Sequence, residues 1–117
     1  MTEQQISATL DELIALVAAG KPLEAFEIFY HDDVEKTELD GVTLRGKDAN
    51  RQAGVALLSK VQAMRDFSPA GKIVKGNRSV LVWSIDYDHA AAGPVKVTEV
   101  AIQDWQDGKI IRERFIA

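Results

Sequence analysis

SVLVWSIDYDH (residues 79–89) and VKVTEVAIQDW (residues 95–105) are the two stretches that decide the fold. Side chains of different character alternate along both, which is typical of β-strands because successive side chains point to opposite faces of a sheet. The segment between them contains Gly93-Pro94, which permits the tight connection of a β-hairpin. The two stretches therefore predict a pair of long antiparallel strands.

The alternation also assigns the side chains of these strands to two faces. In the first stretch, one face holds Leu81, Trp83, Ile85 and Tyr87, and the other holds Val82, Ser84, Asp86 and Asp88. In the second, one face holds Val97, Glu99, Ala101, Gln103 and Trp105, and the other holds Thr98, Val100 and Ile102. Neither face is cleanly polar. We therefore expect helices to cover one face and a second copy of the chain to cover the other, in a homodimer.

Two further strands flank this pair, at residues 70–75 and 109–116. Gly76-Asn77 and Asp107-Gly108 supply the turns that join them to their neighbours. Consecutive strands joined by short turns form an antiparallel meander. Strands of about ten residues lie near the upper end of common lengths and curl when they twist strongly. We therefore expect a strongly curved antiparallel sheet.

The residues before this sheet show helical spacing in three segments. Apolar residues over 6–17 recur at intervals of three and four, which predicts a first helix that ends at Gly20. Pro22 suits the first turn of a second, aromatic helix. A short hairpin is expected over 34–44, and a third helix from 46 to about 65.

Helices that precede a meander of strands give an α+β fold. With 117 residues the chain is long enough for one core, so we expect a single domain over residues 1–117. We expect the three N-terminal helices of this chain to pack on the strongly curved antiparallel sheet and to leave a cone-shaped pocket. Such a pocket is expected to bind a small molecule.

Composition argues against several kinds of partner. The net charge of −4 does not fit a nucleic-acid partner, because phosphate binding needs clustered Lys and Arg. The chain has no cysteine, so no disulfide, thiolate nucleophile or Cys-ligated zinc is expected. The segment up to Gly20 lacks the basic start of a signal peptide, and no stretch is long and apolar enough for a bilayer. We expect a cytoplasmic protein with no nucleic-acid or membrane partner.

Three segments carry a family resemblance: FEIFYHDDV at 26–34, LRGKDA at 44–49 and DWQDGKII at 104–111. In this order and spacing they resemble the SnoaL-like branch of the nuclear transport factor 2-like superfamily. The resemblance implies a curved sheet with helices that form a cone, and frequent homodimers. Members range from ketosteroid isomerases, dehydratases and polyketide cyclases to non-catalytic scaffolds, so the resemblance implies no single activity.

Residue by residue, the resemblance implies a candidate base without its usual partners. The catalytic carboxylate of ketosteroid isomerases falls close to Glu38 of this chain. Their two oxyanion donors fall at Leu13 and Ala101, whose side chains cannot donate. SnoaL-type cyclases place an acid and a histidine on the last strands, whereas the last strand of this chain carries Arg112, Glu113 and Arg114 but no histidine.

The strands themselves add two candidate carboxylates, Glu99 and Asp86, which both have neighbours that are expected to be buried. Burial in an apolar cone would raise the pKa of either group and suit it to general acid or base catalysis. The alternative is a structural cross-strand ion pair with Arg112 or Arg114.

Four further residues are candidates for ligand contact. Tyr30 and Trp83 would shape the pocket, unless they are only core aromatics. Arg112 would polarise a carbonyl group of the ligand. His31 stands beside Asp32-Asp33, where a carboxylate could hold its tautomer, although a surface position is the simpler interpretation. No spacing indicates a metal site, and no motif indicates a cofactor.

Two functions remain open at this stage. The first is a cofactor-free acid–base catalyst of the isomerase, cyclase or dehydratase type, with Glu99, Asp86 or Glu38 moving a proton of a small, largely apolar substrate. The second is a non-catalytic dimeric module that binds a small molecule or a protein partner. The carboxylates on the strands favour the first, and the missing oxyanion donors favour the second.

Overall fold

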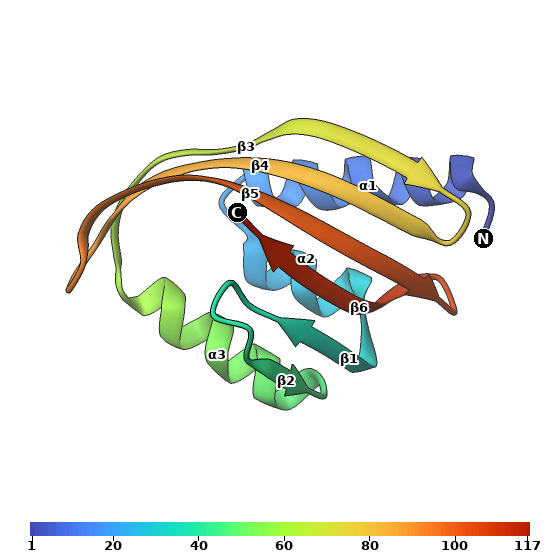
Figure 1. The fold of residues 1–117 in the computed structure, drawn as a ribbon, viewed down its shortest axis with the longest axis horizontal. Helices are drawn as coiled ribbons and strands as arrows, with labels where there is room; N and C mark the ends of the chain where they lie inside the picture. Colours follow the sequence, from blue (N-terminus) through green and yellow to red (C-terminus); the bar gives the residue numbers. More distant parts are fainter.

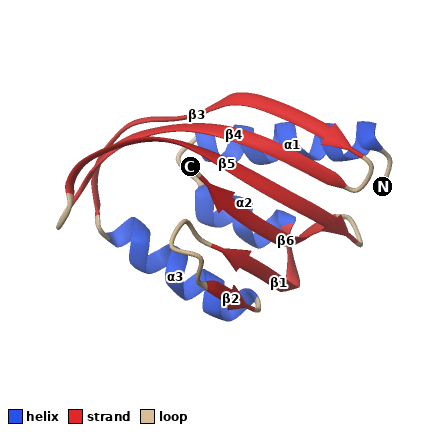
Figure 2. Cartoon of the chain, in the orientation of Figure 1, coloured by secondary structure: helices blue, strands red, loops and turns tan.

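The computed structural model describes residues 1–117 as three helices and one six-stranded sheet (Figure 1, Figure 2). The helices are α1 (Glu3–Ala18), α2 (Pro22–Phe29) and α3 (Lys47–Ser59). The strands are β1 (Tyr30–Thr37), β2 (Thr43–Arg45), β3 (Val61–Lys75), β4 (Arg78–His89), β5 (Gly93–Gln106) and β6 (Lys109–Ile116). Their order across the open sheet is β2-β1-β6-β5-β4-β3. This is the α+β architecture that the sequence predicts.

Both ends of α1 and the start of α2 lie where local sequence chemistry favours them. α1 starts with a capping box, in which Thr2 Oγ1 accepts from the Gln5 backbone at 3.1 Å and Gln5 Oε1 accepts from the Thr2 backbone at 2.8 Å. It ends before Gly20, whose φ of 79° favours glycine. α2 begins at Pro22, as predicted. No helix of the chain has both the length and the apolar character needed to cross a bilayer.

The strands β3 to β6 form the predicted antiparallel meander, but β1 and β6 pair in parallel. β1 follows α2 directly and lies beside the last strand of the chain, with Glu35 opposite Arg112. No tight turn joins these two strands, so nothing local in the sequence sets the direction of their pairing. The alternation of side chains could therefore not reveal it.

α3 ends at Ser59 and β3 begins at Val61, so the predicted third helix is too long and the strand after it too short. Val61, Met64 and Phe67 recur every three residues, which imitates the spacing of a helix. β3 has bulges after Val61 and after Met64, and each extra residue shifts the alternation of the strand by one position. As a result all three side chains line the same cavity.

The sheet is bent where its longest strands extend past their neighbours. The last pair between β5 and β6 is Val100 with Ile116, so residues 93–99 of β5 have no β6 neighbour. Figure 1 shows this end of β3, β4 and β5 curling over on the side where α3 lies. Bulges in β3 increase the bend locally. The concave side of the sheet is thereby enclosed between the curled strands and the helices.

The core lies between the concave face of the sheet and the helices. Leu81 of β4 and Ala101 of β5 are fully buried there with Ile6 and Leu10 of α1. These two strand residues belong to the faces that the alternation groups together, and they are opposite one another in the register. The grouping of side chains that the sequence predicts is therefore confirmed, and this face is the inner one.

Substitutions on the two faces of β4 should differ in their effect on stability. Leu81→Ala removes a fully buried side chain and should lower the free energy of unfolding by about 2–5 kcal/mol, since it leaves a cavity. The matched change Val82→Ala, on the outer face, should lower it less. Urea unfolding of both variants measures the difference. Equal losses would contradict the assignment of the faces.

Candidate functional site

The concave side of the sheet contains a cavity of about 230 Å³. All three helices contribute to its wall, together with β1, β3, β4, β5 and β6. Its aromatic lining consists of Phe26, Tyr30, Phe67, Trp83, Tyr87 and Phe115, and its polar lining of Lys36, Glu38, Asn50 and Glu99. An apolar cavity with a few convergent polar groups is typical of a small-molecule site.

Four residues that the sequence singled out lie together at this cavity, namely Tyr30, Glu38, Trp83 and Glu99. Trp83 and Glu99 are cross-strand neighbours on β4 and β5. The Trp83 ring packs edge-on against Phe67, with 4.9 Å between ring centroids. The inward face of the two long strands therefore supplies both an aromatic wall and a carboxylate.

The Glu99 carboxylate is half-buried and has no hydrogen bond or ion pair with another side chain. Burial raises its pKa and is the largest cause of the shift. The negative charges of Glu38 and Glu113 raise the pKa further, and only the positive charge of Lys36 opposes them. Glu99 is thus a carboxyl group without a partner in the protein, and its pKa lies above the ordinary value.

Glu38 lies just beyond the end of β1 at the rim of the cavity, with 48% of its side chain exposed. Burial is nevertheless the largest cause that raises its pKa, followed by the opposing effect of Lys36 and the repulsion of Glu113. The site therefore holds two carboxyl groups whose pKa values are shifted toward the range in which a group both accepts and releases protons.

Lys36 is a cavity residue that the sequence analysis missed. Its Nζ lies 3.7 Å from Glu113 Oε1 and 4.0 Å from Glu38 Oε1. The signal was present in the period of two along β1, because Val34 is buried and Lys36 follows it on the same face. Lysine is so often a surface residue that this pattern gave no reason to place it inside.

A buried chain of hydrogen bonds runs from the cavity across the sheet. Glu113 accepts at Oε1 from the Tyr30 hydroxyl and at Oε2 from the amide of Gln103, at 2.7 Å each. The Ser79 hydroxyl donates to Gln103 Oε1 at 2.7 Å, and the Trp105 indole donates to Ser79 Oγ at 2.8 Å. Burial, and then the charge of Glu113, raise the pKa of Tyr30. The sequence analysis assigned no role to Glu113 or Gln103.

Asp86 lies outside the cavity, on the outer face of β4. Its Oδ1 is 2.9 Å from Nη2 of Arg65 on β3. Because Trp83 and Tyr87 point inward, alternation turns Asp86 outward. The structure therefore places Asp86 in the structural ion-pair role that the sequence left open, although its partner is Arg65 rather than Arg112 or Arg114.

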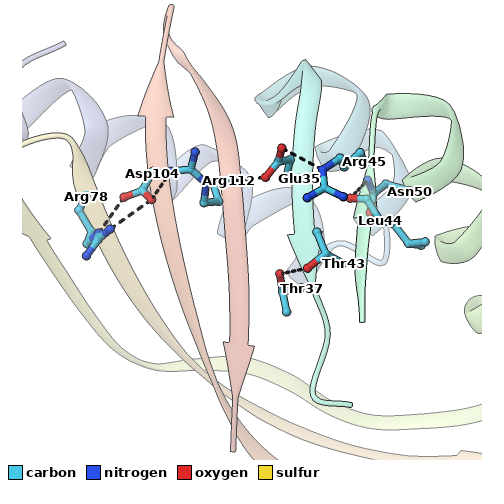
Figure 3. Close-up of polar contacts among 9 residues, drawn as sticks. All are labelled: Glu35, Thr37, Thr43, Leu44, Arg45, Asn50, Arg78, Asp104 and Arg112. Carbon is cyan, nitrogen blue, oxygen red and sulfur yellow. Dashed lines mark hydrogen bonds and ion pairs between the residues drawn. The ribbon is translucent and has the colours of Figure 1, made fainter. Parts of the chain in front are cut away.

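Arg112 also lies on the outer face, in a ladder of charges that crosses five strands (Figure 3). Its Nη1 is 3.4 Å from Asp104 Oδ2, and its Nε is 4.0 Å from Glu35 Oε2. Arg78 extends the ladder on one side, with its Nε 2.7 Å from Asp104 Oδ1. Arg45 extends it on the other side, with its Nε 3.3 Å from Glu35 Oε1. Arg112 is therefore not placed to polarise a group inside the cavity.

His31 lies near the start of β1 and away from the cavity lining. Its Nδ1 accepts a hydrogen bond from the backbone N–H of Asp33 at 3.0 Å, and its Nε2 lies 3.3 Å from Asp107 Oδ2. Because Nδ1 is an acceptor, Nε2 carries the proton and donates to Asp107. His31 thus joins β1 to the turn between β5 and β6 rather than contacting a ligand.

The remaining positions of interest offer no further polar groups. Leu13 lines the cavity and Ala101 is fully buried, so neither position supplies a donor to an oxyanion. The Asn50 amide donates to the backbone oxygen of Leu44 at 3.1 Å (Figure 3). It also donates to the backbone oxygen of Gly46 at 2.8 Å, and so fixes the start of α3. No group of three or more His, Asp or Glu side chains is arranged to hold a metal ion.

Comparison with known proteins identifies relatives over the whole chain. A family model described as SnoaL-like domain matches residues 1–117. A solved structure of a candidate SnoaL-like polyketide cyclase from Mesorhizobium loti is 27% identical, with a TM-score of 0.86 and 100% of each chain covered. No curated protein matches the sequence.

Two more distant structures share the fold. An NTF2-like protein of unknown function from Burkholderia pseudomallei is 17% identical, with a TM-score of 0.80 over 98% of this chain and 90% of that one. A protein with a ketosteroid isomerase-like fold from Catenulispora acidiphila, in complex with trimethylamine, is 10% identical, with a TM-score of 0.76 over 93% and 84%. The descriptions of these relatives name no single shared activity.

The raised pKa of Glu99 predicts how stability depends on pH. Folding takes up a proton in the window between the ordinary value of 4.5 and the higher native pKa. Stability from this group therefore falls as pH rises through that window. Between pH 4 and pH 8, Glu99→Gln should gain stability relative to the wild type as the pH rises through this window, and the gain should be constant above it. Urea unfolding across this range measures the effect.

The same substitution at Glu12, which is exposed on α1, serves as the control. It should not reproduce the effect of Glu99→Gln, because Glu12 lies outside the cavity. A difference between Glu99→Gln and the wild type that does not depend on pH would contradict the assignment of a raised pKa to Glu99.

Proposed function

The chain belongs to the SnoaL-like family, and from this premise we propose that its cavity binds a small, largely apolar molecule with which Glu99 exchanges a proton. This makes the protein a cofactor-free acid–base catalyst of the isomerase, cyclase or dehydratase type. One observation carries the proposal: the Glu99 carboxylate lines an apolar cavity, has no side-chain partner and has a raised pKa. Such a carboxylate is suited to remove a proton from a bound molecule.

The volume of the cavity limits the size of the proposed ligand. An engineered protein cavity of about 150 Å³ holds benzene. A cavity of about 230 Å³ therefore suits one ring with a short substituent. Pockets for drug-sized ligands are larger, at about 300 Å³ or more. This difference favours a one-ring ligand over a four-ring steroid.

The proposed step moves one proton and needs no oxidant or reductant. For a ligand with a C–H bond next to a carbonyl group, the proton passes to the Glu99 carboxylate. The C–H electron pair forms a carbon–carbon double bond, and the π pair of the carbonyl moves to its oxygen. Return of the proton to the same or another carbon completes exchange or isomerisation. Glu38 is a second carboxyl group for this transfer, because it lines the same cavity and its pKa is also raised.

Binding without turnover is the second candidate function. The observation that favours it is the presence of Leu13 and Ala101 at the two positions where isomerases of this fold are expected to have oxyanion donors. Without a donor for the developing negative charge, a base alone gives little acceleration. In that case the cavity would hold its ligand unchanged.

Hydrogen–deuterium exchange distinguishes these two functions. Phenylacetone has one ring and acidic C–H bonds beside a carbonyl group, and so fits the proposed site. In D2O the wild type should catalyse its exchange, and Glu99→Gln should slow this catalysis by about 100-fold or more, as is typical for loss of a general base. Proton NMR of the ketone measures the rate.

Asp86→Asn is the matched control for this experiment, because Asp86 lies on the outer face. It should leave the exchange rate unchanged. If phenylacetone binds in the cavity but exchange is no faster than in buffer, the catalytic proposal is wrong and the binding function remains. If exchange survives in Glu99→Gln, Glu99 is not the base.

We also propose that two copies of the chain associate through the outer face of the sheet. Ile73 on β3 and Ile116 on β6 support this proposal, because 67% and 49% of their surfaces are exposed on that face. Covering exposed apolar side chains on a sheet is a common driving force for dimers.

The homodimer predicts a molecular mass in solution twice that of one chain. Sedimentation equilibrium at about ten micromolar should give this mass for the wild type, and Ile73→Glu should shift the equilibrium toward monomer because it buries a charge in the interface. Ile28→Glu, an exposed change on α2, is the control and should remain dimeric. A monomeric wild type under these conditions would refute the proposal.

A further inference from the structure

Lys36 is a charged cavity residue that the proposed proton transfer does not use. Only 20% of its side chain is exposed, and its Nζ lies 5.7, 5.5 and 5.3 Å from the ring centroids of Phe26, Tyr30 and Phe115. Ammonium groups are attracted to aromatic rings at such distances. The three rings therefore fix the position of the Lys36 ammonium in the cavity.

The N–H groups of Lys36 have no acceptor in the protein at hydrogen-bond distance. The carboxylate oxygens nearest to it, on Glu113 and Glu38, lie 3.7 and 4.0 Å away. By contrast, Lys47 donates to two backbone oxygens at 2.9 and 2.7 Å, and Lys72 donates to Asp11 at 2.7 Å. An ammonium group has three donors. Lys36 therefore offers N–H groups to a molecule in the cavity.

We infer that Lys36 anchors the ligand by donating hydrogen bonds to an anionic or strongly polarised oxygen, such as that of a carboxylate or an enolate. The inference rests on the proposed function, because it places the ligand in the same cavity. It adds the chemical class of the polar end of that ligand. Phe67 and Trp83 then enclose the apolar part, and Glu99 faces the atoms between the two ends.

A cationic ligand is the competing class, because Glu38 and Glu99 are negative when ionised. One observation favours the anion. The rings that would attract the ammonium of a ligand already hold the ammonium of Lys36.

The negative charge of Glu113 does not prevent Lys36 from binding a ligand. Each oxygen of Glu113 already accepts a hydrogen bond, one from Tyr30 and one from Gln103. Glu113 and Lys36 are opposite one another in the register of β6 and β1. Glu113 thus compensates the charge of Lys36 when the cavity is empty, and the N–H groups of Lys36 stay available.

Three probes with the same ring test the inference: phenylacetate is anionic, 2-phenylethylammonium is cationic and ethylbenzene is neutral. Dissociation constants come from titrations followed by backbone amide shifts of the cavity residues. The wild type should bind phenylacetate at least about tenfold more tightly than the amine. Lys36→Met should weaken phenylacetate binding by about 10- to 100-fold, as is typical for loss of a hydrogen bond to a charged group, and should leave ethylbenzene binding unchanged.

Two further variants control for charge and for folding. Lys36→Arg keeps the charge and should keep the preference for phenylacetate. Lys75→Met removes an exposed lysine at the end of β3 and should change nothing. If Lys36→Met does not fold, the preference of the wild type for the anion and the behaviour of Lys36→Arg still decide the question.

The outcomes separate this inference from the proposed function. If none of the three probes shifts the cavity amides, the cavity is not the ligand site and both proposals are wrong. If ethylbenzene binds but phenylacetate is not preferred over the amine, only the inference is wrong. The same holds if Lys36→Met folds and retains the preference.

Discussion

One buried carboxylate, that of Glu113, constrains how the sheet is assembled. Glu113 is 1% exposed. An unpaired charge at such a buried position would lower the free energy of unfolding by several kcal/mol. Tyr30 and Gln103 donate to the carboxylate, and Ser79 and Trp105 extend the same chain of hydrogen bonds. The Lys36 ammonium, 3.7 Å from Glu113 Oε1, adds an opposite charge. No buried side-chain polar atom is left without a partner. A fully satisfied network of this kind favours one arrangement of strands over others.

Asp104 on the outer face of the sheet and Glu99 on the inner face have pKa values that are shifted in opposite directions. On the outer face the Arg78 hydrogen bond lowers the pKa of Asp104, and solvent reaches the pair. On the inner face Glu99 has no such partner, and burial raises its pKa. For these two residues, the face of the strand and the presence of a partner together decide the direction of the pKa shift.

The sequence predicts those features that depend on local pattern. Alternation along β4 and β5 placed Glu99 and Trp83 on one face, and Gly20 and Pro22 placed the end of α1 and the start of α2. The prediction failed where a bulge interrupts the alternation of side chains, as after Met64 in β3. It also failed for the pairing of β1 with β6, which are distant in the chain. Lys36 was missed for a different reason, because a lysine on an alternating strand is usually a surface residue.

The bulges that bend β3 also affect whether strands from other molecules can pair with this edge of the sheet. β3 is an edge strand of 15 residues, and a regular edge of that length would be a template for adding strands from other molecules. Pro69 and the interrupted register remove a continuous row of backbone donors and acceptors. The opposite edge, β2, has only three residues. The irregularity that gives the cavity its shape thus also protects the fold against fibril formation.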